Sequence, residues 1–245
     1  GHFTQGGLVI GQAPAGSKIT FQQRALPLSN DGVFVFGFGR DDTSPQTLQV
    51  TLPGGQSHAH KLVVATRKFD VQSVTGVPAR TVNPDPKDME RIRVEQAAVG
   101  SARDVVSLNT FFREQFQWPV KGPVTGVYGS QRIYNGEPRS PHFGVDLAVP
   151  HGTDIAAPAD GVVSMAYPDM FFSGDTIVID HGMGINTTYL HMSKMLVKKG
   201  DTVKKGQIIG KVGASGRATG PHLCWRLNWF QQRLDPQLIM PTPKP

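Results

Sequence analysis

The stretch Lys199-Gly200-Asp201-Thr202-Val203-Lys204-Lys205-Gly206-Gln207-Ile208-Ile209-Gly210 contains one short pattern twice: a Lys-Gly turn followed by β-branched residues. Glycine permits the positive φ that a tight turn requires, and β-branched side chains favour an extended strand. Each copy therefore predicts a turn that leads into a short strand.

The same character extends through residues 118–240, which are dense in glycine and β-branched residues. Residues 176–179, Thr-Ile-Val-Ile, are a further strand candidate, closed by Asp180-His181-Gly182. Because the segments are short and no helical pattern is convincing, we predict an all-β domain here.

Residues 1–82 also predict β structure. The apolar run at 33–36 lies between glycines, residues 47–52 alternate polar and apolar side chains, and residues 61–65 follow a Pro-Gly-Gly turn. These patterns are typical of short strands, so we expect a small antiparallel β domain, built as two packed sheets.

Residues 83–117 change character and predict a helical connector between the two β regions. Asp85 is suited to an N-cap and Pro86 to the first helical position. We expect one long helix, or two short ones broken near Gly100, over residues 85–112.

The composition excludes several classes of protein. In 245 residues, 38% are hydrophobic and 18% charged, which is typical of a soluble globular chain. No apolar run is long enough to span a bilayer, and no basic block with interleaved aromatics indicates nucleic-acid binding. The single cysteine rules out an intramolecular disulfide. A net charge of +6 favours anionic partners such as cell-wall polymer, nucleic acid or acidic lipid, although a mildly basic enzyme without a polyanionic partner has the same charge.

His142 and Asp146 are the first candidate metal ligands. On a straight strand, a spacing of four residues covers roughly 13 Å, too far for one ion. The backbone must therefore bend between them, and Gly144 is the residue best suited to allow it.

His222 and Cys224 are two residues apart, so on a strand both side chains would point to the same face. Tyr189 and His191 have the same spacing and would also share a face if they lie on a strand. Each pair alone is a weak signal, because buried histidines and lone cysteines are commonly structural.

Together these residues predict a catalytic zinc site. Such a site has three protein ligands and one open position, and His142, Asp146 and Cys224 would supply nitrogen, oxygen and sulfur. The two remaining histidines, His191 and His222, could then take and return the proton that amide hydrolysis requires.

Other candidates carry less weight. His58-Ala59-His60 follows a Pro-Gly-Gly turn, and we interpret it as a solvated turn. No HExxH helix and no G-x-S-x-G elbow appear, and Ser215 is interpreted as part of a turn.

The ordered motifs resemble the lysostaphin-like, LytM-type zinc metallopeptidases of bacterial cell walls, over residues 118–240. The matching segments are His142-Phe143-Gly144-Val145-Asp146, residues 153–163, Tyr189-Leu190-His191, residues 203–210 and residues 215–223. Residues 118–245 are thus expected to form a zinc metallopeptidase domain with a barrel-like β-sheet. Residues 1–82 resemble the β-rich accessory domain of some members, and are available to a protein partner.

The resemblance also implies roles. His142 and Asp146 would be zinc ligands, His222 the catalytic histidine and His191 its partner, placed to stabilise the developing oxyanion. The family expects histidine where this chain has Cys224. Thiolate is a strong zinc donor, so we expect zinc binding to persist at a less positive centre that works more slowly or at higher pH.

The expected activity is endopeptidase cleavage of peptidoglycan cross-links, at the bond between D-alanine and diaminopimelate, in the periplasm or cell envelope. The substrate partners are the peptide stems. One alternative is a degenerate member that binds peptidoglycan or activates a separate hydrolase. A lipoyl-like carrier is a third class, and it would require a modified lysine.

Overall fold

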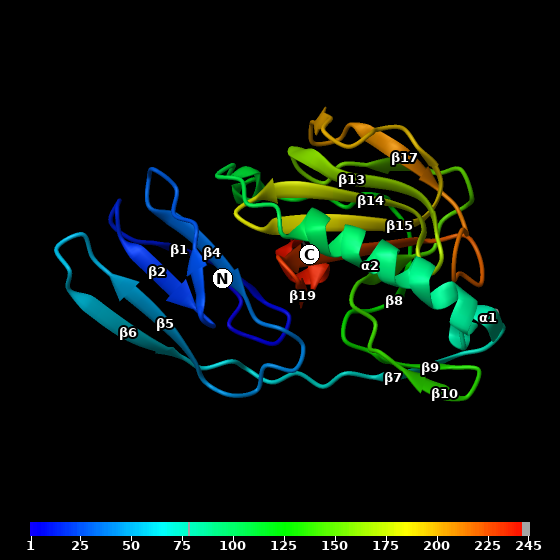
Figure 1. Ribbon diagram of the computed structural model, residues 1–245, viewed down its shortest axis with the longest axis horizontal. Coiled ribbons are helices and arrows are strands. Elements are labelled where there is room, and N and C mark those ends of the chain that lie inside the picture. Colours follow the sequence, from blue (N-terminus) through cyan, green and yellow to red (C-terminus); the bar gives the residue numbers. More distant parts are fainter. Residues whose placement is uncertain (78, 242–245) are drawn as a thin grey trace.

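Two groups of antiparallel strands build most of the computed structural model, which describes residues 1–77 and 79–241 (Figure 1). The N-terminal strands lie on one side of the molecule and a large mixed-length sheet on the other, with helix α2 (Met89–Arg103) crossing beside it. The predicted mainly β fold is confirmed.

The N-terminal strands form a two-stranded sheet, β1-β4, and a four-stranded sheet, β3-β2-β5-β6. The sheets pack against each other through aromatic side chains, with the rings of Phe21 and Phe36 4.5 Å apart. The two packed sheets predicted from the sequence are present. Their strands are β1 (Leu8–Gln12), β2 (Lys18–Phe21), β3 (Arg24–Leu26), β4 (Val33–Gly37), β5 (Gln46–Thr51) and β6 (Ser57–Leu62).

Strand β6 corrects two predictions. Residues 58–60, interpreted as a solvated turn, are paired with β5, although their side chains are exposed. The strand expected at 61–65 overlaps β6 only in its first two residues. The hairpin explains both differences. Its pairing begins at Thr51 and Ser57, directly after the turn, and ends at Gln46 and Leu62, so most of the apolar residues at 62–65 lie beyond the last paired residue.

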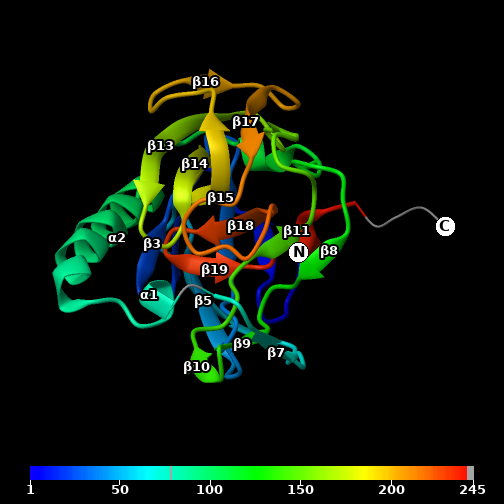
Figure 2. The ribbon, with the colours of Figure 1, turned by 90° about the vertical axis from the view of Figure 1, so that its right-hand side faces the viewer.

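Strand β7 (Val71–Val74) joins the N-terminal half of the chain to the C-terminal half. It pairs in parallel with β9 (Gln131–Tyr134), which forms a hairpin with β10 (Glu137–Arg139). Figure 2 shows these three strands together at one end of the molecule. Hydrophobic packing also joins the two halves, because the ring of Phe21 lies 6.0 Å from that of Trp229 within one connected core.

Helix α1 (Ala79–Val82) lies at the end of the region that was predicted to be β. The predicted connector, residues 83–117, contains a 3-10 turn (Pro86–Asp88), α2 and a second 3-10 turn (Phe111–Arg113). The predicted helix is thus shorter than 85–112, and α2 continues through Gly100 without the expected break. Its apolar face packs against β13 and β14 through Ala102, Met165 and Val178. In the described part of the chain, no helix combines the length and hydropathy needed to cross a membrane.

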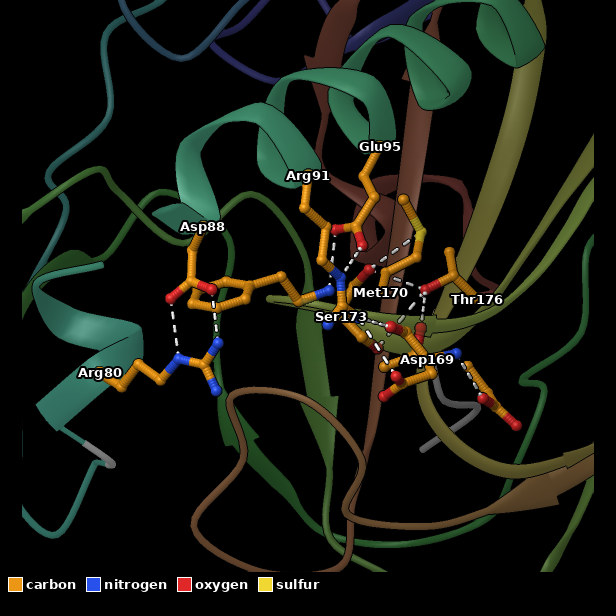
Figure 3. Close-up of polar contacts among 11 residues, drawn as sticks. Arg80, Asp88, Arg91, Glu95, Asp169, Met170, Ser173 and Thr176 are labelled. Atoms are coloured by element: carbon orange, nitrogen blue, oxygen red, sulfur yellow. Dashed lines mark hydrogen bonds and ion pairs between the residues drawn. The ribbon is translucent and has the colours of Figure 1, made fainter. Parts of the chain in front are cut away.

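Polar contacts fix α2 over the sheet (Figure 3). The buried Glu95 carboxylate accepts from the backbone N–H of Phe171 at 2.8 Å and pairs with Arg91 Nε at 2.7 Å. Arg91 reaches on to the Asp169 carboxylate at 3.2 Å. The helix is therefore held against the turn that follows β13.

The large sheet has the order β16-β13-β14-β15-β18-β11-β8, with β17 joining β15 to β12 and β19 joining β18. Its turns include Gly200 and Gly206, whose φ values of 93° and 85° fit the predicted Lys-Gly turns. The strands are β8 (Val124–Gly126), β11 (Val145–Leu147), β12 (Asp154–Ala156), β13 (Gly161–Met170), β14 (Gly174–Gly182), β15 (Ile185–Met195), β16 (Thr202–Val203), β17 (Ile208–Val212), β18 (Leu223–Trp229) and β19 (Gln232–Leu234).

Candidate metal centre

Asp146 and Cys224 face each other as paired residues of β11 and β18. Their neighbours Val145 and Trp225 are fully buried in the core, so alternation along each strand places Asp146 and Cys224 on the opposite face. His142 joins them from the loop before β11, with Nε2 3.0 Å from Asp146 Oδ1 and 3.4 Å from Cys224 Sγ. The three donor atoms lie within 4.8 Å of one another and could hold a metal ion.

The bend predicted between His142 and Asp146 is present, and Gly144 permits it by its lack of a side chain. A Cβ at this position would lie 2.6 Å from the carbonyl oxygen of Trp225. The His142 loop is also held by backbone hydrogen bonds, because His142 N–H donates to the Ser130 carbonyl at 2.8 Å and its own carbonyl accepts from Gly129 at 2.7 Å. Close backbone packing therefore positions the His142 ring.

All three site histidines have the same tautomer. Nδ1 of His142 contacts the Val127 carbonyl at 3.3 Å, Nδ1 of His191 the Ser215 carbonyl at 2.7 Å, and Nδ1 of His222 the Gly220 carbonyl at 2.9 Å. A carbonyl oxygen can only accept, so each Nδ1 carries the proton. In each neutral ring Nε2 is therefore the lone-pair nitrogen, free to bind a metal ion or a proton.

His191 lies at a β-bulge, which the sequence did not predict. Strand β15 pairs with β18 as far as Leu190 and with β17 from Met192 onward. Between them His191 has a φ of 64°, so regular alternation stops there. As a result His191 and Leu190 both line the site, while Tyr189 is buried in the core. The expectation that Tyr189 and His191 share a face was wrong.

Burial and neighbouring charges shift the pKa values of the site residues in different directions. Burial disfavours the charged form of His142, but Asp146 and Cys224 outweigh burial and raise its pKa to about 9. Burial alone would raise the pKa of Asp146, yet His142, His222 and Arg132 lower it well below its usual range. Burial, reinforced by His222, lowers the pKa of His191 to about 3, so its ring is neutral near neutral pH.

Arg132 is a site residue that the sequence did not indicate. Its Nη2 lies 2.8 Å from Asp146 Oδ2, which leaves Oδ1 to face His142 and His222. The Oδ1–Nε2 distance to His222 is 3.9 Å. No motif relates Arg132 on β9 to Asp146 on β11, because their contact depends on how the two strands meet in space.

All five predicted site residues line one cavity of about 510 Å³. His191 and His222 are adjacent there, with ring centroids 4.8 Å apart. Helix α2 forms another wall of the cavity through residues that include Ile92 and Arg103. The other histidine pair, His58 and His60, lies exposed on β6 and does not line this cavity.

Comparison with known proteins identifies the family of the chain. Residues 140–236 match the model of peptidase family M23. A solved structure from Pseudomonas aeruginosa, assigned to peptidase M23, is 30% identical, covers 98% of this chain and 96% of that one, and has a TM-score of 0.76. The chain belongs to peptidase family M23, as the sequence resemblance indicated.

Curated relatives match less than half of the chain. Peptidoglycan DD-endopeptidase ShyA of Vibrio cholerae is 49% identical over 116 residues, which are 45% of this chain and 26% of that protein. DD-carboxypeptidase/endopeptidase Mpg of Neisseria meningitidis is 38% identical over 104 residues, 42% of this chain and 24% of that protein. The matched region thus corresponds to about a quarter of the length of these relatives.

Proposed function

We propose that this chain is a zinc-dependent endopeptidase that cleaves the peptide cross-links of bacterial peptidoglycan, at the bond between D-alanine and diaminopimelate. The observation that carries the proposal is the convergence of three metal donors and two further histidines in one cavity. The names of the relatives ShyA and Mpg support the substrate class. A peptidoglycan substrate in turn favours a periplasmic or cell-envelope location.

The donor set fits zinc, which binds imidazole nitrogen, carboxylate oxygen and thiolate sulfur. We assign Nε2 of His142, Oδ1 of Asp146 and Sγ of Cys224 as the ligand atoms, because Nδ1 and Oδ2 already bind Val127 and Arg132. When bound, zinc supplies the Lewis acidity that activates water and polarises a carbonyl.

We assign the remaining chemistry to the two histidines. His222 has a lone pair on Nε2 near Asp146 and acts as the general base that takes a proton from the attacking water. His191 lies beside it, and its Nε2 can stabilise an oxyanion only when it carries a proton. The one proton that His222 takes from water is therefore shared with His191 Nε2 while the oxyanion is present. It then returns to His222, which delivers it to the leaving amine.

Metal content and product analysis test this function together. The chain purified without chelator should contain about one zinc ion, and it should convert cross-linked muropeptide dimers into monomers whose masses identify the cleaved bond. Cys224→His provides the comparison. Exchanging thiolate for neutral imidazole raises the net charge of the zinc and its ligands from about zero to about +1, so this variant should work faster or at lower pH.

The alternative function is that of a degenerate member that binds peptidoglycan without cleaving it. Cys224 is the residue that favours it, because the family expects histidine at this position. That reading predicts a chain that sediments with peptidoglycan, contains no zinc and leaves cross-linked dimers intact. Zinc together with cleaved dimers would exclude it.

A further inference from the structure

The cavity beside the metal centre has more positive than negative charge. Both of its carboxylates are already engaged: Asp146 pairs with Arg132 at 2.8 Å, while Glu95 binds Arg91 and the Phe171 N–H. Several arginines therefore face the cavity without an available partner. The charged residues that line it are Arg103, Arg132, Arg217, Arg226, Arg233, Glu95 and Asp146.

Arg103 is the most unusual of these arginines. It is the last residue of α2, only 4% exposed, and its Nε has no hydrogen-bond partner. In the part of the chain that the structure describes, no carboxylate forms an ion pair with it, in contrast to Arg132. Burial, together with the charges of Arg233 and Arg226, lowers the pKa of Arg103 well below its usual value. A buried charge without a counter-ion is strongly destabilising, so this arrangement favours an anion supplied from outside.

Arg233 and Arg226 complete the cluster. Nη1 of Arg233 donates to Asn228 Oδ1 at 3.0 Å, but a neutral amide leaves its charge uncompensated. Burial, then Arg226, lowers the pKa of Arg233 to about 9. Burial also opposes the charge of Arg226, but its contact with Cys224 outweighs this and raises its pKa. Arg226 thus connects the cluster to the metal donors.

Arg217 has a different role. Its guanidinium lies over the rings of Phe172 and Tyr134, at 4.7 Å and 4.9 Å, and its Nη1 donates to the Thr81 carbonyl at 3.2 Å. It is therefore engaged with α1 and with neighbouring aromatic side chains. Among the described residues, no carboxylate forms an ion pair with Arg103, Arg226 or Arg233: Arg233 binds only the neutral Asn228 amide, and Arg226 contacts Cys224.

We propose that Arg103, Arg226 and Arg233 form a subsite for a free carboxylate of the substrate, next to the metal centre. The proposal rests on the proposed function. In a D-alanine–diaminopimelate cross-link, the carbon bonded to the scissile nitrogen carries a free carboxylate. Guanidinium groups bind carboxylates through paired N–H···O hydrogen bonds, which the planar fork of arginine matches. The subsite selects cross-links whose leaving side carries this charge and positions the scissile bond at the metal donors.

The subsite is tested first with two ligands that differ only in the carboxylate, and then with variants of the protein. Calorimetry on the full chain would compare two product peptides that end in diaminopimelate, one with the free carboxylate and one with the carboxamide. We expect the free carboxylate to bind at least about tenfold more tightly. Arg103→Gln and Arg233→Gln should each remove most of that preference. Arg93→Gln, an exposed position on the same helix, should keep it.

Equal affinity of the wild-type chain for the two peptides would overturn the subsite. So would variants that weaken both peptides to the same extent. The fate of the proposed function is read separately, from cleavage of cross-linked dimers: cleavage with no carboxylate preference would remove the subsite alone, and carboxylate preference with no cleavage would remove the activity alone.

A second measurement guards against misfolded variants. Arg103→Met keeps an extended side chain and removes the unpaired charge, so its Tm without ligand should equal or exceed that of the wild-type chain. A clear fall in Tm would mean that the charge of Arg103 has a structural partner, which contradicts the subsite.

Discussion

Asp146 and Cys224 are directly paired across β11 and β18, so two of the three proposed metal donors are neighbours in one ladder of the sheet. Both strands are buried on their other face by Val145 and Trp225. The carboxylate and the sulfur therefore have fixed positions, which a loop would not provide. Because the strands hold these side chains in place, replacing one donor should leave the other where it is, and each substitution can be interpreted separately.

Cys224→Ala should remove a metal ligand while leaving the fold in place. Losing a directly bound donor should weaken zinc binding by more than the roughly 10–100-fold that outer contacts provide. Zinc content after dialysis against a graded metal buffer measures the effect. Full occupancy and an unchanged cleavage rate in the variant would mean that sulfur is not a ligand.

Arg132→Gln should weaken zinc binding through Asp146 without removing a donor. The guanidinium fixes Oδ2, so its loss lets the carboxylate turn and should reduce metal affinity roughly 10–100-fold. Arg139→Gln is the matched control, because Arg139 pairs with Arg132 across the β9–β10 hairpin but contacts Asn83 and Glu137 instead. Equal zinc affinity in the two variants would contradict this role.

The two site histidines should differ in how well an amide replaces them. His222→Ala is expected to lower kcat roughly 10²–10⁴-fold, as loss of a general base does. Glutamine at position 191 can donate a hydrogen bond to an oxyanion without taking a proton, so His191→Gln should retain more activity than His191→Ala. Identical kcat values for the two His191 variants would show that hydrogen-bond donation is not its role.

The pH dependence of folding should report on His181, away from the metal centre. His181 is fully buried between the Asp160 carbonyl and the Thr187 hydroxyl, and burial lowers its pKa from 6.5 to about 4. Between these values the unfolded chain binds more protons than the folded one. The contribution of neutral His181 to the unfolding free energy is therefore complete above pH 6.5. It is lost as the pH falls towards 4, which lowers the unfolding free energy by on the order of 3 kcal/mol.

Denaturant unfolding at pH 5 and pH 7.5 measures the contribution of His181 to the unfolding free energy. In His181→Gln the difference in unfolding free energy between the two pH values should shrink, whereas His58→Gln, on the exposed β6, should leave it unchanged. A wild-type pH dependence in the His181 variant would exclude this group as the source.

Gly144→Ala should damage both the fold and the site. The added Cβ would meet the Trp225 carbonyl at 2.6 Å, and backbone cannot yield as a side chain can, so we expect a loss of about 1–3 kcal/mol in unfolding free energy. Zinc affinity should fall with it, because the same loop holds His142. Gly54→Ala, where nothing lies within 4 Å of the new Cβ, is the control and should unfold like the wild-type chain.

The cluster of His142, Asp146 and Cys224 could be predicted because each residue lies in a short motif with its own spacing. His142 and Asp146 are separated by a single bend, and Cys224 follows His222 closely in sequence. The strands and turns of the large sheet follow from local glycine and β-branched patterns in the same way. Such features need only neighbouring residues to be recognised.

The partners of those donors depend on the tertiary fold and could not be predicted. Arg132 reaches Asp146 across two strands, and Arg103 reaches the cavity from the end of a helix. The bulge at His191 arises because β15 changes partner from β18 to β17, which no residue of β15 indicates by itself. Likewise, the four residues of β7 contain no pattern that predicts its parallel pairing with β9.

That parallel pairing has a practical consequence for dissecting the molecule. A fragment beginning near Trp118 would lose β7 and leave the outer backbone groups of β9 uncapped, on the very strand that carries Arg132. Bare strand margins recruit other chains, so the isolated fragment would be prone to self-association and its carboxylate ligand would be less firmly braced. The N-terminal half thus protects the free edge of the strand that carries Arg132.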